Sequence, residues 1–191
     1  MKKITFILIL FFGLQINLYA DPNRIFSGKN NAKIVIIAYE SLTCSHCADF
    51  HKNVYPQLKK DYLDTGLAKI EFRHFPLDIA AFNASKIAQC KKDQGLEILE
   101  SLYSNQQDWV KGSTVEQVNN NLKKFIEKSG YEIDFDKCIN NKDIEDYVLN
   151  DRIEGVKNFD VNATPTIIIN NKKFEKSLNY KNLKKSLEKL I

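Results

Sequence analysis

Residues 34–47 read IVIIAYESLTCSHC, and this stretch decides the fold. The apolar run at 34–39 predicts a buried β-strand. Two cysteines follow three positions apart, and a helical pattern of apolar residues then extends to about Leu63. Thr43 is predicted to cap this helix, so Cys44 falls in its first turn. The sequence therefore predicts a strand, a short loop and a helix that begins with two thiols.

The predicted position of Cys44 favours a reactive thiol. Backbone N–H groups in the first turn of a helix lack partners, and the helix dipole is positive there, so a thiolate is favoured over a thiol. A lowered thiol pKa is what fast thiol–disulfide exchange requires. Cys47 is close enough to close a small disulfide ring with Cys44 or to resolve a mixed disulfide. Redox exchange is therefore our first hypothesis.

Three other interpretations of the cysteine pair compete with redox exchange. Haem attachment requires a histidine directly after the second cysteine, where this chain has Ala48. A zinc site needs two more ligands, and His51 with either Cys90 or Cys138 would supply them, but no second paired motif exists. Two half-buried cysteines without redox chemistry remain an alternative.

The N-terminus, residues 1–20, predicts a signal peptide. Two lysines precede an apolar run at 4–14, and Ala20 stands at the expected cleavage position. Leu18 is larger than the residue usually found there, and an uncleaved anchor remains the alternative. The apolar run is short for a membrane span, which takes about 20 residues. We expect a mature domain of residues 21–191 in an oxidising compartment, where disulfides persist.

The charge balance gives no support for a polyanionic partner. The chain has 28 basic and 24 acidic residues, and two of the lysines belong to the predicted signal peptide. The remaining balance is too even to favour nucleic acid or an anionic surface. The length fits one domain with an inserted subdomain.

The rest of the chain predicts an α/β fold. Pro56 lies inside the predicted redox helix and lacks a backbone donor, so we expect a kink there. Residues 21–32 are predicted to be a polar lead-in. The helical pattern over about 77–160 is too long for a loop and predicts an inserted helical subdomain. The remaining predicted elements are strands at 69–75, 166–170 and 172–174, a hairpin turn at Asn170-Asn171, and a last helix over about 180–190.

These features resemble the DsbA family of thiol:disulfide oxidoreductases, which has a thioredoxin fold with a helical insertion. Cys44-Ser45-His46-Cys47 is similar to the family's C-P-H-C motif, with Ser in place of Pro. Thr164-Pro165 before a strand resembles the cis-proline loop that faces the motif. Glu40 resembles the acidic residue that many members bury under it. Phe75-Pro76-Leu77 after the second strand also fits, and the similarity spans about residues 30–190.

The resemblance implies roles for the motif and the loop. Cys44 is the attacking thiolate, Cys47 is its buried partner, and His46 places a polar or positive group beside the Cys44 sulfur. Thr164 and Pro165 present backbone groups to an extended substrate. A surface role for His46 and a trans bond before Pro165 remain alternatives.

The roles of Glu40, His51 and His74 are less narrowly predicted. Glu40, if buried, exchanges a proton with Cys47. An exposed carboxylate at the end of the strand is the alternative. His51 and His74 are interpreted as packing or surface residues.

Cys90 and Cys138 both fall in the helical block. An oxidising compartment and an even number of cysteines favour a structural disulfide between them. Two buried free thiols are the alternative.

The leading hypothesis for function is an exported oxidase in the periplasm. It donates its Cys44–Cys47 disulfide to reduced exported proteins, and a DsbB-like membrane oxidase reoxidises it. The runner-up is a disulfide isomerase or reductase kept reduced in the same space. A third hypothesis, of a different class, is a binding or metal-delivery protein that uses the thiols as ligands.

The leading hypothesis needs no cofactor beyond the redox-active disulfide. It also predicts a monomer. Only about a dozen residues separate the expected cleavage site from the first predicted strand, which is little for the oligomerisation segment that isomerases of this superfamily carry.

Overall fold

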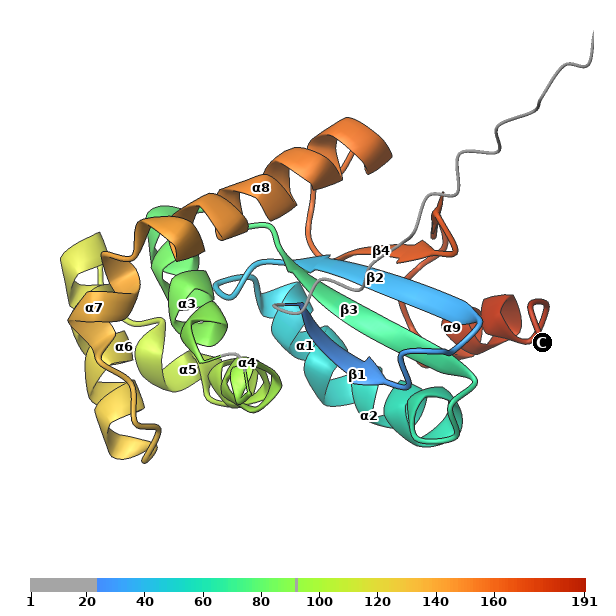
Figure 1. Cartoon of the computed structure of the whole chain (residues 1–191), viewed down its shortest axis with the longest axis horizontal. Helices are drawn as coiled ribbons and strands as arrows, with labels where there is room; N and C mark the ends of the chain where they lie inside the picture. The colour runs from blue at the N-terminus through green and yellow to red at the C-terminus, as the bar shows by residue number, and fades with distance from the viewer. Residues whose placement is uncertain (1–23, 92) are drawn as a thin grey trace, which may run out of the picture.

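One mixed β-sheet organises the molecule. The computed structural model describes residues 24–91 and 93–191, so the predicted signal peptide lies outside the described residues. The strands of this part are β1 (Ile25–Gly28), β2 (Ile34–Glu40), β3 (Ala68–His74), β4 (Thr166–Ile169) and β5 (Lys172–Lys173). They lie in the order β1-β3-β2-β4-β5 (Figure 1). β2 and β3 are parallel, and the other neighbours are antiparallel.

β2 lies at the centre of the sheet because both of its faces can be buried. Its sequence is almost continuously apolar, which is typical of a strand covered on two sides. Ile36 and Ala38 join the larger apolar core on one face. Ile37 and Tyr39 join a smaller apolar cluster on the other face. β2 ends at Glu40, and a short loop of residues 41–43 connects it to the cysteine motif.

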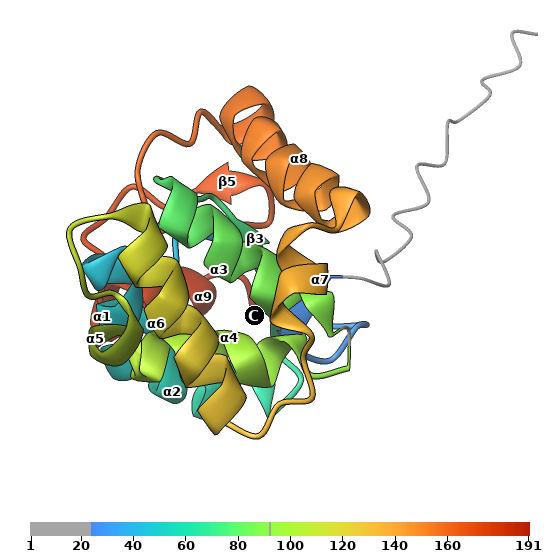
Figure 2. The same ribbon diagram turned by 90° about the vertical axis from the view of Figure 1, so that its left-hand side faces the viewer.

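Helices cover both faces of the sheet and extend beyond one end of it. The segment α1 (Ser45–Asn53), α2 (Tyr55–Leu58) and the π-helix η1 (Lys59–Leu63) connects β2 to β3, and α9 (Tyr180–Leu187) contacts α2. A helical block lies between β3 and β4, and Figure 2 looks onto it. The block consists of α3 (Ile79–Cys90), α4 (Gly95–Ser104), α5 (Gln106–Trp109), α6 (Val115–Lys128), α7 (Phe135–Ile139) and α8 (Lys142–Phe159). The predicted α/β fold with a helical insertion is confirmed.

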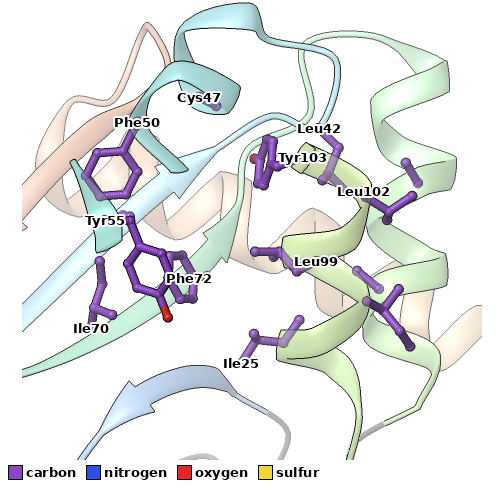
Figure 3. Close-up of a cluster of buried hydrophobic side chains, with 14 of the residues drawn as sticks. Ile25, Leu42, Cys47, Phe50, Tyr55, Ile70, Phe72, Leu99, Leu102 and Tyr103 are labelled. Carbon is purple, nitrogen blue, oxygen red and sulfur yellow. The ribbon is translucent and has the colours of Figure 1, made fainter. Parts of the chain in front are cut away.

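The main apolar core is shared by the sheet and the helical block (Figure 3). Phe50 of α1 and Phe72 of β3 lie on the sheet side of this core, and Leu99 and Tyr103 of α4 lie on the other. The redox helix contacts both parts, because the His51 ring lies 5.2 Å from the ring of Phe72 and 4.2 Å from that of Tyr103, measured between centroids.

α8 lies very close to the sheet at Gly155. A Cβ atom there would come within 2.8 Å of the Tyr39 ring, so a glycine is needed for this approach. One turn earlier, the buried Asp151 accepts a 2.9 Å hydrogen bond from the backbone N–H of His74. The same carboxylate also pairs with Arg24. Asp151 therefore ties α8, β3 and the beginning of β1 together.

The two pairs of cysteines are in different states. Cys90, at the end of α3, and Cys138, in α7, form a disulfide with a sequence separation of 48. Cys44 and Cys47 are free thiols. The disulfide lies inside the helical block, and the free pair lies at the start of α1.

Three local predictions are wrong. Residues 25–28 are not part of a polar lead-in but form β1, because Ile25 and Ser27 are buried and the strand pairs with β3. Thr43 does not cap α1, since its hydroxyl donates to Asp78 at 2.7 Å, and Cys44 is the N-cap residue. The redox helix breaks at Val54, and Pro56 stands in the first turn of α2, where its missing N–H has no helical partner to lose.

Candidate active site

Cys44 and Cys47 lie at the point where β2 passes into α1. Cys44 is the N-cap residue and makes no side-chain cap, so the N–H groups of the first turn stay available for its sulfur. Cys44 is half-buried, whereas the side chain of Cys47 has 0% exposure. Cys44 is thus partly accessible, and Cys47 is enclosed.

The two thiols have opposite pKa shifts. Hydrogen bonding from the Cys47 thiol lowers the pKa of Cys44 to about 5, and the nearby Thr164 together with the backbone N–H groups of Cys47 and His46 acts in the same direction. Burial raises the pKa of Cys47 far above its usual value, and the proximity of Cys44 and Glu40 adds to this. At neutral pH the pair therefore holds one half-buried thiolate and one buried thiol.

A loop before β4 faces Cys44. The Thr164–Pro165 bond is cis. In its thiol form, Cys44 donates a hydrogen bond through Sγ to the backbone carbonyl oxygen of Thr164, at 3.4 Å. The Thr164 hydroxyl is buried and has no hydrogen-bond partner within the described residues. The structure thus brings together the motif and the loop, which are 120 residues apart.

A groove of about 560 Å³ lies beside the cysteine pair. His46 and Asp49 of α1 line one side, and Thr164, Pro165 and Tyr180 line the other. His46 is exposed, so its side chain is at the rim of the groove, and its contribution to the Cys44 thiolate comes through its backbone N–H. The groove thus lies between the start of the redox helix and the loop at Thr164 and Pro165.

Glu40 is buried under the motif. Its side chain lies at the end of β2 and is 4% exposed, so the alternative of an exposed carboxylate is wrong. Glu40 Oε2 is 2.8 Å from Nε2 of His51, which lies one helical turn after Cys47. The ring of His51 stacks on Tyr103 with centroids 4.2 Å apart. Burial raises the pKa of Tyr103 well above its usual value, and the nearby Glu40 and Cys47 act in the same direction.

Gln106 of α5 holds the backbone of the redox loop. Its buried amide donates to the carbonyl oxygen of Leu42 at 2.8 Å and to that of Cys44 at 3.1 Å. A side chain of the helical block thus fixes the two ends of the loop that carries Cys44.

Tyr103 and Gln106 could not be predicted as site residues from the sequence. Tyr103 and Gln106 come from the helical block, some 60 residues from the motif, and only the tertiary fold brings them near it. His51 had a usable signal, since position 51 repeats the helical face of Cys47. It is a packing residue, as predicted, but one with a specific carboxylate partner.

The family model described as Thioredoxin matches residues 20–189. The chain belongs to the thioredoxin family. Within this family it is DsbA-like: α-DsbA1 from Wolbachia pipientis is 30% identical with a TM-score of 0.80, and the match covers 91% of this chain and 93% of that one. The resemblance to DsbA and the thioredoxin fold are confirmed.

Further relatives of this thioredoxin-family chain have names that refer to disulfide formation or exchange. "Disulfide bond formation protein D" of Bacillus subtilis is 24% identical over 181 residues, which cover 85% of this chain and 74% of that protein. Proteins of Rickettsia bellii and Rickettsia conorii named as protein-disulfide oxidoreductases are 35% and 27% identical. The matches span only 34% and 47% of the length of these two proteins.

The described part of this thioredoxin-family chain has neither a metal cluster nor a spanning helix. Within residues 24–91 and 93–191, no three His, Cys, Asp or Glu side chains gather as a metal site would need. In the same residues, none of the helices combines the length and apolar character needed to cross a membrane.

Proposed function

We propose that this chain is an exported protein-disulfide oxidoreductase that introduces disulfide bonds into secreted or periplasmic proteins through Cys44 and Cys47. The observation that carries the proposal is the lowered pKa of Cys44, about 5, beside a buried Cys47 thiol. A stabilised thiolate stabilises the reduced form, and the oxidised form then becomes a stronger oxidant.

The reaction consists of two exchanges at sulfur. A substrate thiolate attacks Sγ of Cys44 in the oxidised protein, the Cys44–Cys47 bond breaks, and Cys47 leaves and takes up a proton. A second substrate thiolate then attacks the substrate sulfur of the mixed disulfide, and Cys44 leaves as a thiolate. The substrate loses two electrons and gains a disulfide, and the protein is reduced. A low pKa makes Cys44 a good leaving group in the second exchange.

The loop at Thr164 and Pro165 has the proposed role of binding the substrate backbone. Pro165 offers no N–H, so hydrogen bonds to an extended peptide come from Thr164 and its neighbours. The groove between this loop and His46 gives the peptide a path to Cys44. We further propose that the protein acts as a periplasmic monomer after cleavage behind Ala20 and that a DsbB-like membrane oxidase regenerates its disulfide.

The second candidate is a disulfide isomerase or reductase kept reduced in the same compartment. It would use the same thiolate to attack existing disulfides. The low pKa of Cys44 favours the oxidase, because a strongly stabilised thiolate makes the protein easy to reduce and a weak reductant.

The proposal is tested by mixing the oxidised protein with reduced, unfolded ribonuclease in the absence of other oxidants. We expect one new substrate disulfide for each protein molecule consumed, and none with Cys44→Ser. A variant with Cys90→Ala and Cys138→Ala is the matched control and should retain the activity. If the oxidised protein leaves the substrate thiols free, while the reduced protein repairs scrambled ribonuclease, the isomerase is correct.

A further inference from the structure

The proposed reaction leaves one proton without an assigned route, and the inference below rests on that reaction. When the protein is reoxidised, the Cys47 thiol must become a thiolate before it can attack Cys44. Cys47 has no exposure, and burial opposes its ionisation. A proton acceptor within the fold is therefore needed, together with a path from that acceptor to water.

Glu40 and His51 form a buried pair next to Cys47. Their side chains are 2.8 Å apart, and Glu40 is close enough to influence the Cys47 thiol. Each partner also keeps one buried polar atom without a hydrogen bond in the described structure, Oε1 of Glu40 and Nδ1 of His51. A pair retained only for stability is normally fully hydrogen-bonded. The open atoms are sites at which a proton can be received or released.

A second opening connects this pair to the surface. It is a hollow of about 370 Å³, separate from the substrate groove, and we call it the side hollow. His51 and Tyr103 line its inner part, and the exposed Lys52 and Gln107 lie at its rim. His51 thus borders Glu40 on one side and the side hollow on the other.

Several titratable groups lie around the His51 ring. They are Cys47, Asp49 and Lys52 on α1, Glu40 on β2, Tyr55 on α2, and Tyr103 on α4, with Glu100 of α4 acting through Tyr55. β3 contributes the apolar ring of Phe72. Of these carboxylates, Glu40 contacts the ring directly, with its Oε2 at hydrogen-bond distance from Nε2 of His51.

We propose that His51 is a positioning and proton-relay residue: it accepts the proton that Glu40 takes from Cys47 and passes it to water in the side hollow. The Cys47 thiol gives its proton to Glu40, and the thiolate attacks Sγ of Cys44 in a mixed disulfide. The Cys44–Cys47 bond forms, and the bond to the partner sulfur breaks. The partner leaves as a thiolate and takes a proton from water, so protons and electrons balance.

The test separates the step that needs Cys47 from the step that does not. The reduced protein is mixed with glutathione disulfide at several pH values, and samples are quenched with acid and weighed by mass spectrometry. In the first step, the Cys44 thiolate forms a mixed disulfide. In the second step, Cys47 displaces glutathione. The variant is His51→Gln, whose amide can still bond Glu40 but cannot carry a proton.

We expect His51→Gln to slow the second step by about tenfold or more and to flatten its pH profile, because general acid–base groups contribute at least this much. The first step should change by less than about twofold. The matched control is His74→Gln, which alters another buried histidine, one that pairs with Gln89. It should leave both steps near the wild-type rates.

A second variant guards against an effect of packing alone. His51→Ala should be slow in the second step, and free imidazole should restore part of the rate, with no such effect on the wild type. Unchanged second-step kinetics in His51→Gln, or the absence of imidazole rescue, would overturn the relay. If wild-type protein never displaces the glutathione, the proposed function itself fails, which is a separate result.

Discussion

Cys44 is the residue on which the chemistry depends, and its environment is built from main-chain and side-chain donors. In the unfolded chain, a cysteine has a pKa of about 8.5. In the folded, reduced protein the hydrogen bond from Cys47 and the further donors lower the pKa of Cys44 to about 5. The folded state thus binds fewer protons than the unfolded state between these two pH values, so its stability rises with pH across this window.

The first prediction concerns this window. The reduced protein should gain stability relative to the oxidised protein as pH rises from about 5 to about 8.5, and the gain should be lost as pH falls through 5. Thiolate absorbance in the ultraviolet should titrate with a midpoint near 5 and be missing in Cys44→Ser. A midpoint near the value of a free cysteine would contradict the described donors.

The sequence could predict the residues of the motif but only part of their surroundings. The spacing of Cys44 and Cys47 and the position after a strand are local signals, and the resemblance added Glu40 and Pro165. The pairing of Glu40 with His51 could not be predicted. Its bond to His51 depends on how α1 packs on β2, which the sequence pattern does not specify.

At the scale of elements, the short loop between β2 and α1 is held by the helical block. Gln106 accounts for two hydrogen bonds to this loop, at the carbonyl oxygens of Leu42 and Cys44. Trp109 lies at the other end of α5 from Gln106, and its indole N–H donates to the carbonyl oxygen of Leu102 at 2.9 Å. This bond holds α5 against α4. The insertion therefore positions the redox loop as well as covering the sheet.

The second prediction tests this contact. Gln106→Leu keeps the side-chain size but removes both donors, so it should lower the free energy of unfolding by about 1–3 kcal/mol. Urea unfolding measures the loss. Gln107→Leu, at the exposed neighbouring position, is the control and should change stability little. Equal stability of the two variants would mean that the loop does not depend on Gln106.

Elements with strong periodicity were predictable, and short ones were not. β3 alternates buried and half-buried residues along its whole length, and Asn170 and Asn171 both adopt the positive φ that a tight hairpin turn needs. β1 has only four residues and becomes a strand because β3 offers it an edge. η1 follows a proline-containing turn, and its π geometry has no sequence signal that we identified.

At the scale of the whole molecule, the helical block and the sheet share an apolar core. One cross-link lies within the block, and another joins the block to the sheet. The Cys90–Cys138 bond joins α3 to α7 within the block. Asp151 joins α8 to β3 and to Arg24. The block is thus cross-linked internally, and Asp151 attaches it to β3 at His74, the residue that pairs with Glu40 of β2.

The third prediction concerns the cross-link within the block. Replacing Cys90 and Cys138 with alanine should lower the free energy of unfolding by about 4 kcal/mol, from the chain entropy of a loop closed across a separation of 48. Urea unfolding of the oxidised protein and of the double variant gives the difference. Alkylation without reductant should leave both residues unmodified in the wild type. Modification of both residues, or an unchanged unfolding free energy, would contradict a structural disulfide.

The measurement that tests the central claim most directly is the redox equilibrium of the purified protein with glutathione. The stabilised Cys44 thiolate predicts an oxidising potential, near the value of about −120 mV that is known for DsbA itself. A potential near −270 mV, about that of thioredoxin, would contradict the oxidase and indicate a reductase or isomerase.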